Sequence, residues 1–208
     1  MKIKRAFHRF NSARTAIIDL SDVHLQWCGL ATLAGTSGSG KTTLFRLLSA
    51  WYDGEESSCV FDPEIDRYLR IRFVGAHESL LPWRSVGGNF EFRGVQREAA
   101  AELLDEMELP LRVLDLRTYE LSYGMYKRVE LAIAVHDDPE LLLLDEFFTS
   151  IDDRAKGSIR DYLSRRRCTS KTWVTAHEEE LRNSLASTHF SLVLDEVTRC
   201  VIGVRPFE

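Results

Sequence analysis

The sequence lacks most of the features that mark membrane-spanning, secreted and zinc-binding proteins. Its longest strongly apolar runs, such as Leu141 to Leu144, are far shorter than the roughly 20 residues that a membrane-spanning helix needs. The start of the chain, MKIKRAFHRF, has no apolar stretch of the kind found in signal peptides. The cysteines are scattered without the CxxC or Cys/His spacing of zinc sites, and we expect them to be reduced and structural: Cys28, Cys59, Cys168 and Cys200. These absences predict a chain that stays in the cytoplasm.

An excess of positive charge is also missing. The chain has 27 lysine and arginine residues against 32 aspartate and glutamate residues, and the net charge of −5 offers no support for binding to nucleic acid. With 44% hydrophobic and 28% charged residues, the composition is typical of a soluble globular protein. A length of 208 residues without repeats, low-complexity tracts or Pro/Gly-rich linkers predicts one domain, or one domain with a small inserted lobe.

The sequence does contain a regular alternation of strand-like and helix-like segments. Near the start, the β-like runs TAIIDL and LATLAG lead into a Gly/Ser loop and then into KTTLFRLLSAW, whose apolar residues recur at helical spacing up to Trp51. Later come a helix (YKRVELAIAVH), the strand ELLLLDE, a helix around 153–166, the strand TWVTAH and a final β-like stretch, FSLVLDEVTRCVIGV. This alternation predicts an α/β fold with a largely parallel sheet, whose ligands gather at the carboxyl ends of its strands.

The middle of the chain has a helical pattern instead. In QREAAAELLDEMEL, the apolar residues Ala100, Leu103, Leu104 and Met107 mark one face of a helix, and Pro110 closes the segment. The pattern begins at about residue 77 and contains no convincing strand. It therefore predicts a helical insert within the α/β domain.

A glycine-rich loop lies between the predicted strand LATLAG and the helix that follows it. The stretch GTSGSGKTT fits the pattern G-x-x-x-x-G-K-[ST] in the strand and helix context that makes the pattern credible. Its glycines let backbone N–H groups turn inward around a polyphosphate, and the start of the next helix adds its positive dipole end. Lys41 is expected to reach the β- and γ-phosphates, and the Thr42 hydroxyl to ligate Mg²⁺. The nucleotide-binding residues that this loop predicts are Gly35, Thr36, Ser37, Gly38, Ser39, Gly40, Lys41, Thr42 and Thr43.

Two carboxylates end the apolar run LLLLDE. A fully buried parallel strand has this composition, and its carboxyl end would deliver Asp145 and Glu146 to the phosphate site. Asp145 is expected to hold Mg²⁺, directly or through water, and Glu146 to orient or deprotonate an attacking water. The long separation from the phosphate loop suits a P-loop ATPase with an insert.

Together these residues resemble the nucleotide-binding domain of ABC ATPases, and the resemblance covers nearly the whole chain. It rests on five features in the family's order: the phosphate loop at 35–42, LLPW at 80–83, LSYGM at 121–125, LLLLDE at 141–146 and TAH at 175–177. The family implies a P-loop NTPase fold in a single domain, 1–208, with a largely parallel sheet, an antiparallel β subdomain and a helical subdomain inserted at about 77–135. It also implies an enzyme that hydrolyses ATP with Mg²⁺ as a head-to-tail homodimer.

The resemblance assigns roles to further residues. His177 falls where the family's switch histidine contacts the γ-phosphate and links it to Glu146. Asp152 matches the last residue of the family's D-loop, which lies across the dimer interface, although TSID could equally be a helix cap. Phe10 resembles the aromatic residue that stacks on adenine, with Phe7 as a close competitor and a plain core role open for both.

One departure from the family's pattern precedes LLPW. Members of the family usually carry a glutamine there, which touches Mg²⁺ and relays the nucleotide state to the helical lobe. An ungapped reading puts Ala76 at this position, with His77 beside it. Because alanine cannot ligate Mg²⁺, either His77 substitutes after a one-residue slip or the relay is weakened.

The second departure is the family's signature, LSGGQ, which has become LSYGM. In the family, the serine hydroxyl and the N–H of the second glycine clamp the γ-phosphate of the opposite subunit's ATP from the start of a helix. Ser122 and Gly124 keep these atoms, whereas Tyr123 and Met125 change the shape and flexibility of the interface. We therefore expect ATP-driven dimerisation to persist.

The resemblance implies an ATP-hydrolysing subunit of a membrane importer, located in the cytoplasm on the inner face of the membrane. Its partners would be integral permease subunits, with a substrate-binding protein as a further candidate. LLPWRSV at 80–86 resembles the permease-contacting region of nitrate, sulfonate and taurine importers, but it could also pack into the insert's own core. A second hypothesis is a soluble ABC-type ATPase switch that acts on nucleic acid or a protein partner. A third, a nucleotide or small-molecule kinase, shares the phosphate loop but leaves LSYGM, TSID and TAH unexplained.

Overall fold

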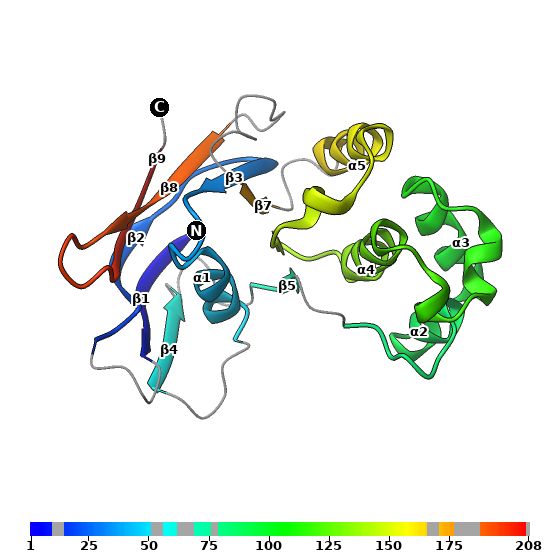
Figure 1. The fold of residues 1–208 in the computed structure, drawn as a ribbon, viewed down its shortest axis with the longest axis horizontal. Helices are drawn as coiled ribbons and strands as arrows, with labels where there is room; N and C mark the ends of the chain where they lie inside the picture. Colours follow the sequence, from blue (N-terminus) through cyan, green and yellow to red (C-terminus); the bar gives the residue numbers. More distant parts are fainter. Residues whose placement is uncertain are drawn as a thin grey trace.

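The computed structural model describes residues 1–9, 15–50, 56–61, 69–75, 79–165, 171–176 and 188–206. Within these residues the chain forms nine strands, five α-helices and three short 3-10 helices (Figure 1). The strands are β1 (Lys2–Arg9), β2 (Ile18–His24), β3 (Leu30–Ala34), β4 (Glu56–Phe61), β5 (Ile71–Val74), β6 (Leu141–Leu144), β7 (Lys171–Ala176), β8 (Thr188–Leu194) and β9 (Val201–Pro206). The helices are α1 (Lys41–Leu48), α2 (Val86–Phe92), α3 (Arg97–Glu106), η1 (Leu111–Asp115), η2 (Thr118–Glu120), α4 (Tyr123–His136), η3 (Phe147–Ser150) and α5 (Asp153–Arg165).

The described strands join one sheet in the order β4-β1-β2-β9-β8-β3-β7-β6-β5. The run β8-β3-β7-β6-β5 is parallel throughout. At the other side, β1 is antiparallel to β2 and β4, and β9 is antiparallel to β8. The predicted α/β class, with a largely parallel sheet and an antiparallel β region, is confirmed. β7 lies between β3 and β6 and is parallel to both. The carboxyl ends of these three strands, which are far apart in the chain, therefore lie side by side.

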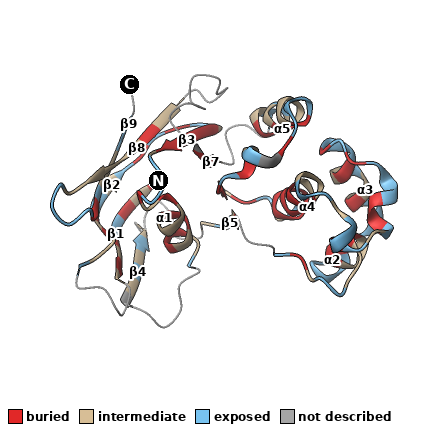
Figure 2. Cartoon of the chain, viewed as in Figure 1, coloured by how far each residue is buried: buried red, intermediate tan, exposed pale blue. Residues whose placement is uncertain are grey.

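The two faces of the parallel strands carry separate cores. On β6, Leu141 and Leu143 pack with the apolar residues of α1, whereas Leu142 and Leu144 pack with those of α4 and α5. Successive side chains of a strand point to opposite faces, and with both faces covered all four leucines are buried. Figure 2 shows the buried residues of α1 and α4 in red. This double burial explains the uninterrupted run of leucines.

The helices α2, α3 and α4 gather at one end of the molecule, away from the antiparallel strands (Figure 1). The face predicted for α3 is confirmed, because Ala100, Leu104 and Met107 are all buried and Leu103 packs against the same core. We refer to α2, α3, η1, η2 and α4 as the helical lobe. None of the helices in the described part of the chain has the length and apolar character needed to span a bilayer.

The final β-like stretch is a hairpin of β8 and β9. The turn between the strands is built around Asp195, whose carboxylate accepts hydrogen bonds from the backbone N–H groups of Thr198, at 2.7 Å, and Val197, at 3.2 Å. The hydrogen bond from the Thr198 backbone is the largest cause of the lowered pKa of Asp195. A side chain that binds backbone N–H groups two and three residues ahead favours a turn over a continued strand, so the stretch folds back on itself.

Candidate functional site

Several segments that carry predicted site residues begin where the parallel strands end, at the carboxyl ends of these strands. The register pairs Ala34 with Ala176 across β3 and β7, and Val74 with Leu144 across β5 and β6. The phosphate loop, defined as residues 35–42, begins directly after β3, and Asp145 directly follows β6. The carboxyl ends of parallel strands are where open α/β sheets bind their ligands.

The phosphate loop turns at positions that only glycine tolerates. Gly40 precedes α1 with φ of 97°. A Cβ at Gly35, where φ is 156°, would lie 2.7 Å from Ser39 Oγ. The Ser39 side chain is buried, and its hydroxyl has no hydrogen-bond partner among the described residues. A buried hydroxyl without a partner, inside a loop that leads into a helix N-terminus, fits a phosphate ligand.

Lys41 is the first residue of α1 and is 7% exposed. Its ammonium group donates hydrogen bonds to the backbone carbonyls of Gly35, at 2.6 Å, and Thr36, at 3.0 Å. The cation therefore lies against the loop that precedes it, next to the N–H groups of the first turn of α1. A polyphosphate in this loop would meet a lysine cation and a helix N-terminus together. Of the other loop residues, Thr36, Ser37 and Gly38 are exposed, and Gly35, Gly40, Thr42 and the adjacent Thr43 are partly buried.

Asp145 is the centre of a hydrogen-bond network that joins α1, β6 and β7. Its side chain is 2% exposed, and its Oδ2 accepts from Thr42 Oγ1 at 2.7 Å. Its Oδ1 accepts from Thr175 Oγ1 at 2.9 Å, and the same threonine hydroxyl accepts from the backbone N–H of Glu146 at 2.7 Å. One hydroxyl thus fixes both acidic residues, because it donates to one and accepts from the other.

Thr175 was not among the site residues predicted from the sequence, where the stretch TAH was assigned a role only through its histidine. Thr175 is 4% exposed at the end of β7. The available signal was a threonine near the end of a buried strand, two residues before the expected switch histidine.

Glu146 leaves β6 in a left-handed backbone conformation, with φ of 49°. Such a conformation costs a residue other than glycine about 1–3 kcal/mol. Hydrogen bonds hold it, because the Glu146 carbonyl also accepts from Thr149 Oγ1 at 2.6 Å. The Glu146 side chain itself is exposed. A fixed backbone with a solvent-accessible carboxylate suits a group that must orient a water molecule.

The residues present fit a magnesium ion bound together with phosphate. Thr42 Oγ1 and the two carboxylate oxygens of Asp145 are hard oxygen ligands held within one network. The described part of the chain contains no group of three or more His, Cys, Asp and Glu side chains that could hold a metal. Mg²⁺ usually takes only one or two protein ligands and completes its shell with phosphate and water, so this small ligand set is sufficient.

The signature residues Ser122 and Gly124 lie at the start of α4. Ser122 is the N-cap, and its Oγ accepts from the backbone N–H of Met125 at 3.2 Å. The hydroxyl keeps its own proton to donate, and the N–H groups of the first turn have no partner within the helix. The apolar residues of α1 and α4 belong to the separate cores of the two sheet faces. The signature and the phosphate loop of one copy therefore start helices on opposite faces.

Asp152 caps a helix in the structure. Its Oδ1 accepts from the backbone N–H of Ala155 at 3.0 Å in the first turn of α5. This backbone hydrogen bond is the largest cause of the lowered pKa of the Asp152 carboxyl. The helix-cap reading of TSID is therefore right for Asp152, and its role at a dimer interface stays a prediction.

Four positions predicted for the site lie outside the described residues, namely Phe10, Ala76, His77 and His177, and so do Trp51 and Cys168. His177 directly follows β7 in the chain. Phe7, the competitor of Phe10, lies on β1, is partly buried, and has the Arg5 guanidinium 5.8 Å from its ring centroid. Which aromatic residue contacts adenine stays a prediction.

Comparison with known proteins identifies the family. Residues 21–149 match the family model described as ABC transporter. An Fe(3+) ions import ATP-binding protein of Yersinia pestis, FbpC, is 32% identical over 158 residues, which cover 69% of this chain and 45% of that protein. A sulfate/thiosulfate import ATP-binding protein of Bordetella pertussis, CysA, is 29% identical over 182 residues, or 79% of this chain and 51% of that protein. The chain thus spans about half the length of these relatives.

The fold also matches a solved ATP-binding cassette. The dimeric post-hydrolysis structure of MJ0796 bound to ADP and Pi superposes with a TM-score of 0.72 at 20% identity, covering 100% of this chain and 98% of that one. FbpC and CysA are named for the import of iron and of sulfate/thiosulfate, so the closer resemblance to nitrate, sulfonate and taurine importers stays a prediction. The family match extends over more than half of the chain and agrees with the cassette fold. The chain belongs to the ABC transporter family.

Proposed function

We propose that this chain binds and hydrolyses ATP as one half of a head-to-tail dimer, and that the dimer drives import through a partner membrane permease. The observation that carries the proposal is the network of Thr42, Asp145, Thr175 and Glu146 beside the phosphate loop. It ties the expected magnesium ligands to the backbone of the residue expected to act on water. The relatives FbpC and CysA are named as import ATP-binding proteins, which supports ATP as the nucleotide of this chain.

Each residue of the network has a task in this reaction. Lys41 and the N–H groups of the phosphate loop would bind the β- and γ-phosphates. Thr42 and Asp145 would hold Mg²⁺, which neutralises negative charge on phosphate oxygens when it is bound. Glu146 would orient the attacking water and accept its proton. His177 would contact the γ-phosphate, as the family resemblance implies.

Dimerisation would complete the site. Ser122 and Gly124 start α4, on the face of the sheet opposite to α1, so they would serve the nucleotide of a second copy. Tyr123, between them, is 46% exposed. A half-exposed ring between the two residues expected to clamp phosphate is available to contact a partner surface.

The stretch LLPW supports contact with a permease. Leu80 is buried, at 8% exposure, but Trp83 is 70% exposed, so the stretch does not pack wholly into the insert's own core. Phe92, at the end of α2, is also 59% exposed. Trp83 lies three residues before α2 and Phe92 is its last residue. Exposed aromatic side chains are enriched at protein interfaces. A dimer docked there would lie in the cytoplasm on the inner face of the membrane.

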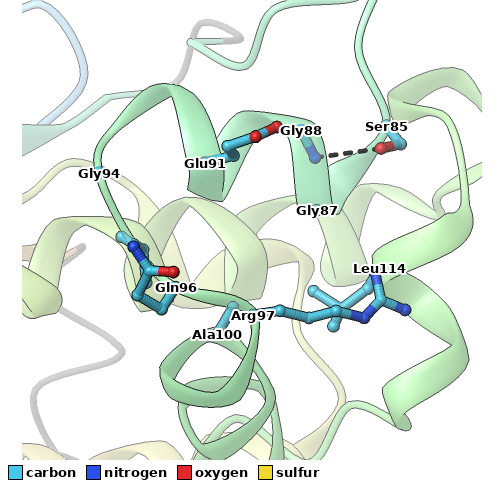
Figure 3. Close-up of a pocket in the computed structure, with 10 residues that line it drawn as sticks. Ser85, Gly87, Gly88, Glu91, Gly94, Gln96, Arg97, Ala100 and Leu114 are labelled. Atoms are coloured by element: carbon cyan, nitrogen blue, oxygen red, sulfur yellow. Dashed lines mark hydrogen bonds between the residues drawn. The ribbon is translucent and has the colours of Figure 1, made fainter.

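A cavity of about 460 Å³ opens beside α2 in the helical lobe (Figure 3). Gly87 and Glu91 of α2 line one side, and Arg97 of α3 lines the other. A Cβ at Gly87 would lie 3.0 Å from the Leu114 carbonyl oxygen, so the glycine lets α2 approach η1 closely at the rim of this cavity. A hollow lined by the charged residues Glu91 and Arg97 adds to the support for a protein contact on the helical lobe.

Two substitutions test the ATPase. Lys41→Ala should abolish tight ATP binding, measured by calorimetry with MgATP. Glu146→Gln should bind ATP but hydrolyse it very slowly and accumulate as a dimer, measured by size-exclusion chromatography with ATP. Undiminished hydrolysis by the Glu146→Gln protein would sink the role of Glu146, and wild-type protein that binds no ATP would sink the proposed activity.

A second experiment tests the permease. The protein, expressed beside its neighbouring genes, should sediment with membranes and copurify with a membrane-spanning protein. Trp83→Ser should reduce this copurification while ATP binding persists. Val197→Ser, which also replaces a solvent-exposed apolar residue but in the β8–β9 turn, is the control. Protein that stays soluble with full ATPase activity would favour the alternative, an ABC-type switch acting on nucleic acid or a protein partner.

A further inference from the structure

A buried ion pair joins α4 to the segment that leaves β5. Lys127 and Glu130 lie one turn apart on α4, are 1% and 3% exposed, and bring Nζ within 2.8 Å of Oε2. Lys127 Nζ also donates to the carbonyl of Gly75, the residue directly after β5. The other oxygen of Glu130, Oε1, accepts from Ser79 twice, from its N–H at 2.9 Å and its hydroxyl at 2.6 Å. One ion pair thus binds Gly75 through its cation and Ser79 through its anion.

The contacts continue in both directions along α4. The Tyr126 hydroxyl accepts from the backbone N–H of Leu80 at 2.8 Å, immediately after Ser79. Towards the start of the helix, the ammonium of Lys127 lies 5.4 Å from the ring centroid of Tyr123, within the range of a cation–π interaction. A continuous set of contacts therefore runs from the signature surface to the segment between β5 and α2.

Stability alone is a weak reason to bury these two charges. Removing a lysine and a glutamate from water is costly, and apolar residues of similar volume often fold as well or better. The position of the pair suggests another reason. Gly75 follows Val74, whose carbonyl accepts from the backbone N–H of Asp145 at 2.9 Å. The cation therefore holds a strand end beside the acidic site, and the anion holds the residue that leads into the helical lobe.

We propose that the Lys127–Glu130 pair, covered by Tyr123, is the relay between the nucleotide edge of the sheet and the helical lobe in this chain. Its two contacts, Gly75 and Ser79, flank the position where an ungapped match to the family places Ala76 in place of the glutamine. The inference rests on the proposed function, because a relay needs a nucleotide to report. Lys127 and Glu130 are positioning residues, since they act on Gly75 and Ser79.

A charge-free pair tests the relay. Lys127→Met combined with Glu130→Gln keeps both side chains long and leaves an amide oxygen to accept from Ser79, but removes the ion pair and the donor to Gly75. The control is Leu104→Ala, which removes buried apolar volume from α3 and no part of the pair. The readouts are kcat and KM for ATP, and the ATP-dependent change in amide hydrogen exchange of α2, the latter measured in a Glu146→Gln background.

The double variant should lose about fivefold or more in kcat, as expected for positions within a coupling network. Its KM for ATP should stay within about twofold, because the phosphate loop is unchanged. The ATP-dependent exchange change in α2 should disappear, and Leu104→Ala should keep it. Wild-type kcat and exchange behaviour in the double variant would overturn the relay, and so would an equal loss of the exchange change in Leu104→Ala.

Ser79→Ala decides the question if the double variant does not fold. It removes only the hydroxyl donor to Glu130, and we expect about twofold lower kcat with a smaller exchange change in α2. An unchanged Ser79→Ala protein would then overturn the relay. If the wild type hydrolyses ATP and the variants match it in kcat and in α2 exchange, the relay is refuted and the proposed function is not. If the wild type does not hydrolyse ATP, the proposed function is refuted and the relay with it.

Discussion

Replacing Thr175 with valine removes one hydroxyl and keeps the shape of the side chain. In the structure this hydroxyl donates to Asp145 at 2.9 Å and accepts from the backbone N–H of Glu146 at 2.7 Å. The substitution leaves the buried carboxylate oxygen of Asp145 and the partly buried N–H group of Glu146 without this partner. A fully buried unsatisfied group costs about 1–3 kcal/mol, and the partly buried one costs less. Taking about 3 kcal/mol for the two together, the melting temperature of a chain of this size should fall by about 6–12 °C.

ATP hydrolysis should fall as well, because Thr175 fixes the expected magnesium ligand and the backbone of the expected water-orienting residue. We expect about tenfold to hundredfold lower kcat, which is the usual effect of a small misplacement of catalytic groups. The assays are thermal denaturation by circular dichroism and steady-state hydrolysis over a Mg²⁺ titration, at a temperature well below both melting points. Thr175→Ser keeps the hydroxyl and is the control. A valine variant that melts with the wild type and keeps its kcat would refute the reasoning.

Three further variants test other parts of the site. Gly35→Ala should abolish ATP binding in calorimetry, because its Cβ would lie 2.7 Å from Ser39 Oγ; wild-type affinity would contradict the close packing of the loop. Asp152→Ala should melt below the wild type at neutral pH. Because the backbone hydrogen bond from Ala155 lowers the pKa of Asp152 in the folded chain, its carboxylate stabilises the fold above its unfolded pKa. The difference should shrink as the pH falls through the folded pKa, and a pH-independent difference in circular dichroism melting would count against the cap. Tyr123→Gly with Met125→Gln should raise ATP-dependent dimerisation in size-exclusion chromatography if Tyr123 and Met125 weaken the clamp; no change or a loss would mean that these two residues suit their own interface.

Much of the fold could be predicted because it depends on neighbours along the chain. The burial of Ala100, Leu104 and Met107 on α3 followed from helical spacing, and the position of β6 followed from an apolar run between polar segments. The first strand, β1, was missed. Its pairing with β4 shifts register between Ile3 and Arg5, so its burial does not alternate regularly. β4 and β5 were also missed, because ESSCVF and IRFV are short and carry polar residues.

The sequence by itself determined the local chemistry of the site: a loop whose turns require glycine, a lysine and a threonine at the start of a helix, and two carboxylates at the end of a buried strand. Only the tertiary structure decided which of these groups meet. Thr42 and Asp145 are 103 residues apart in the chain, and Lys127 and Gly75 are 52 apart. Such partners are chosen by the order of strands in the sheet and by the face on which each helix packs. The pattern of residues along the chain does not encode those contacts locally. For this reason the hydrogen bonds of Thr175 to Asp145 and Glu146, and the contacts of the Lys127–Glu130 pair, could be identified only from the tertiary structure.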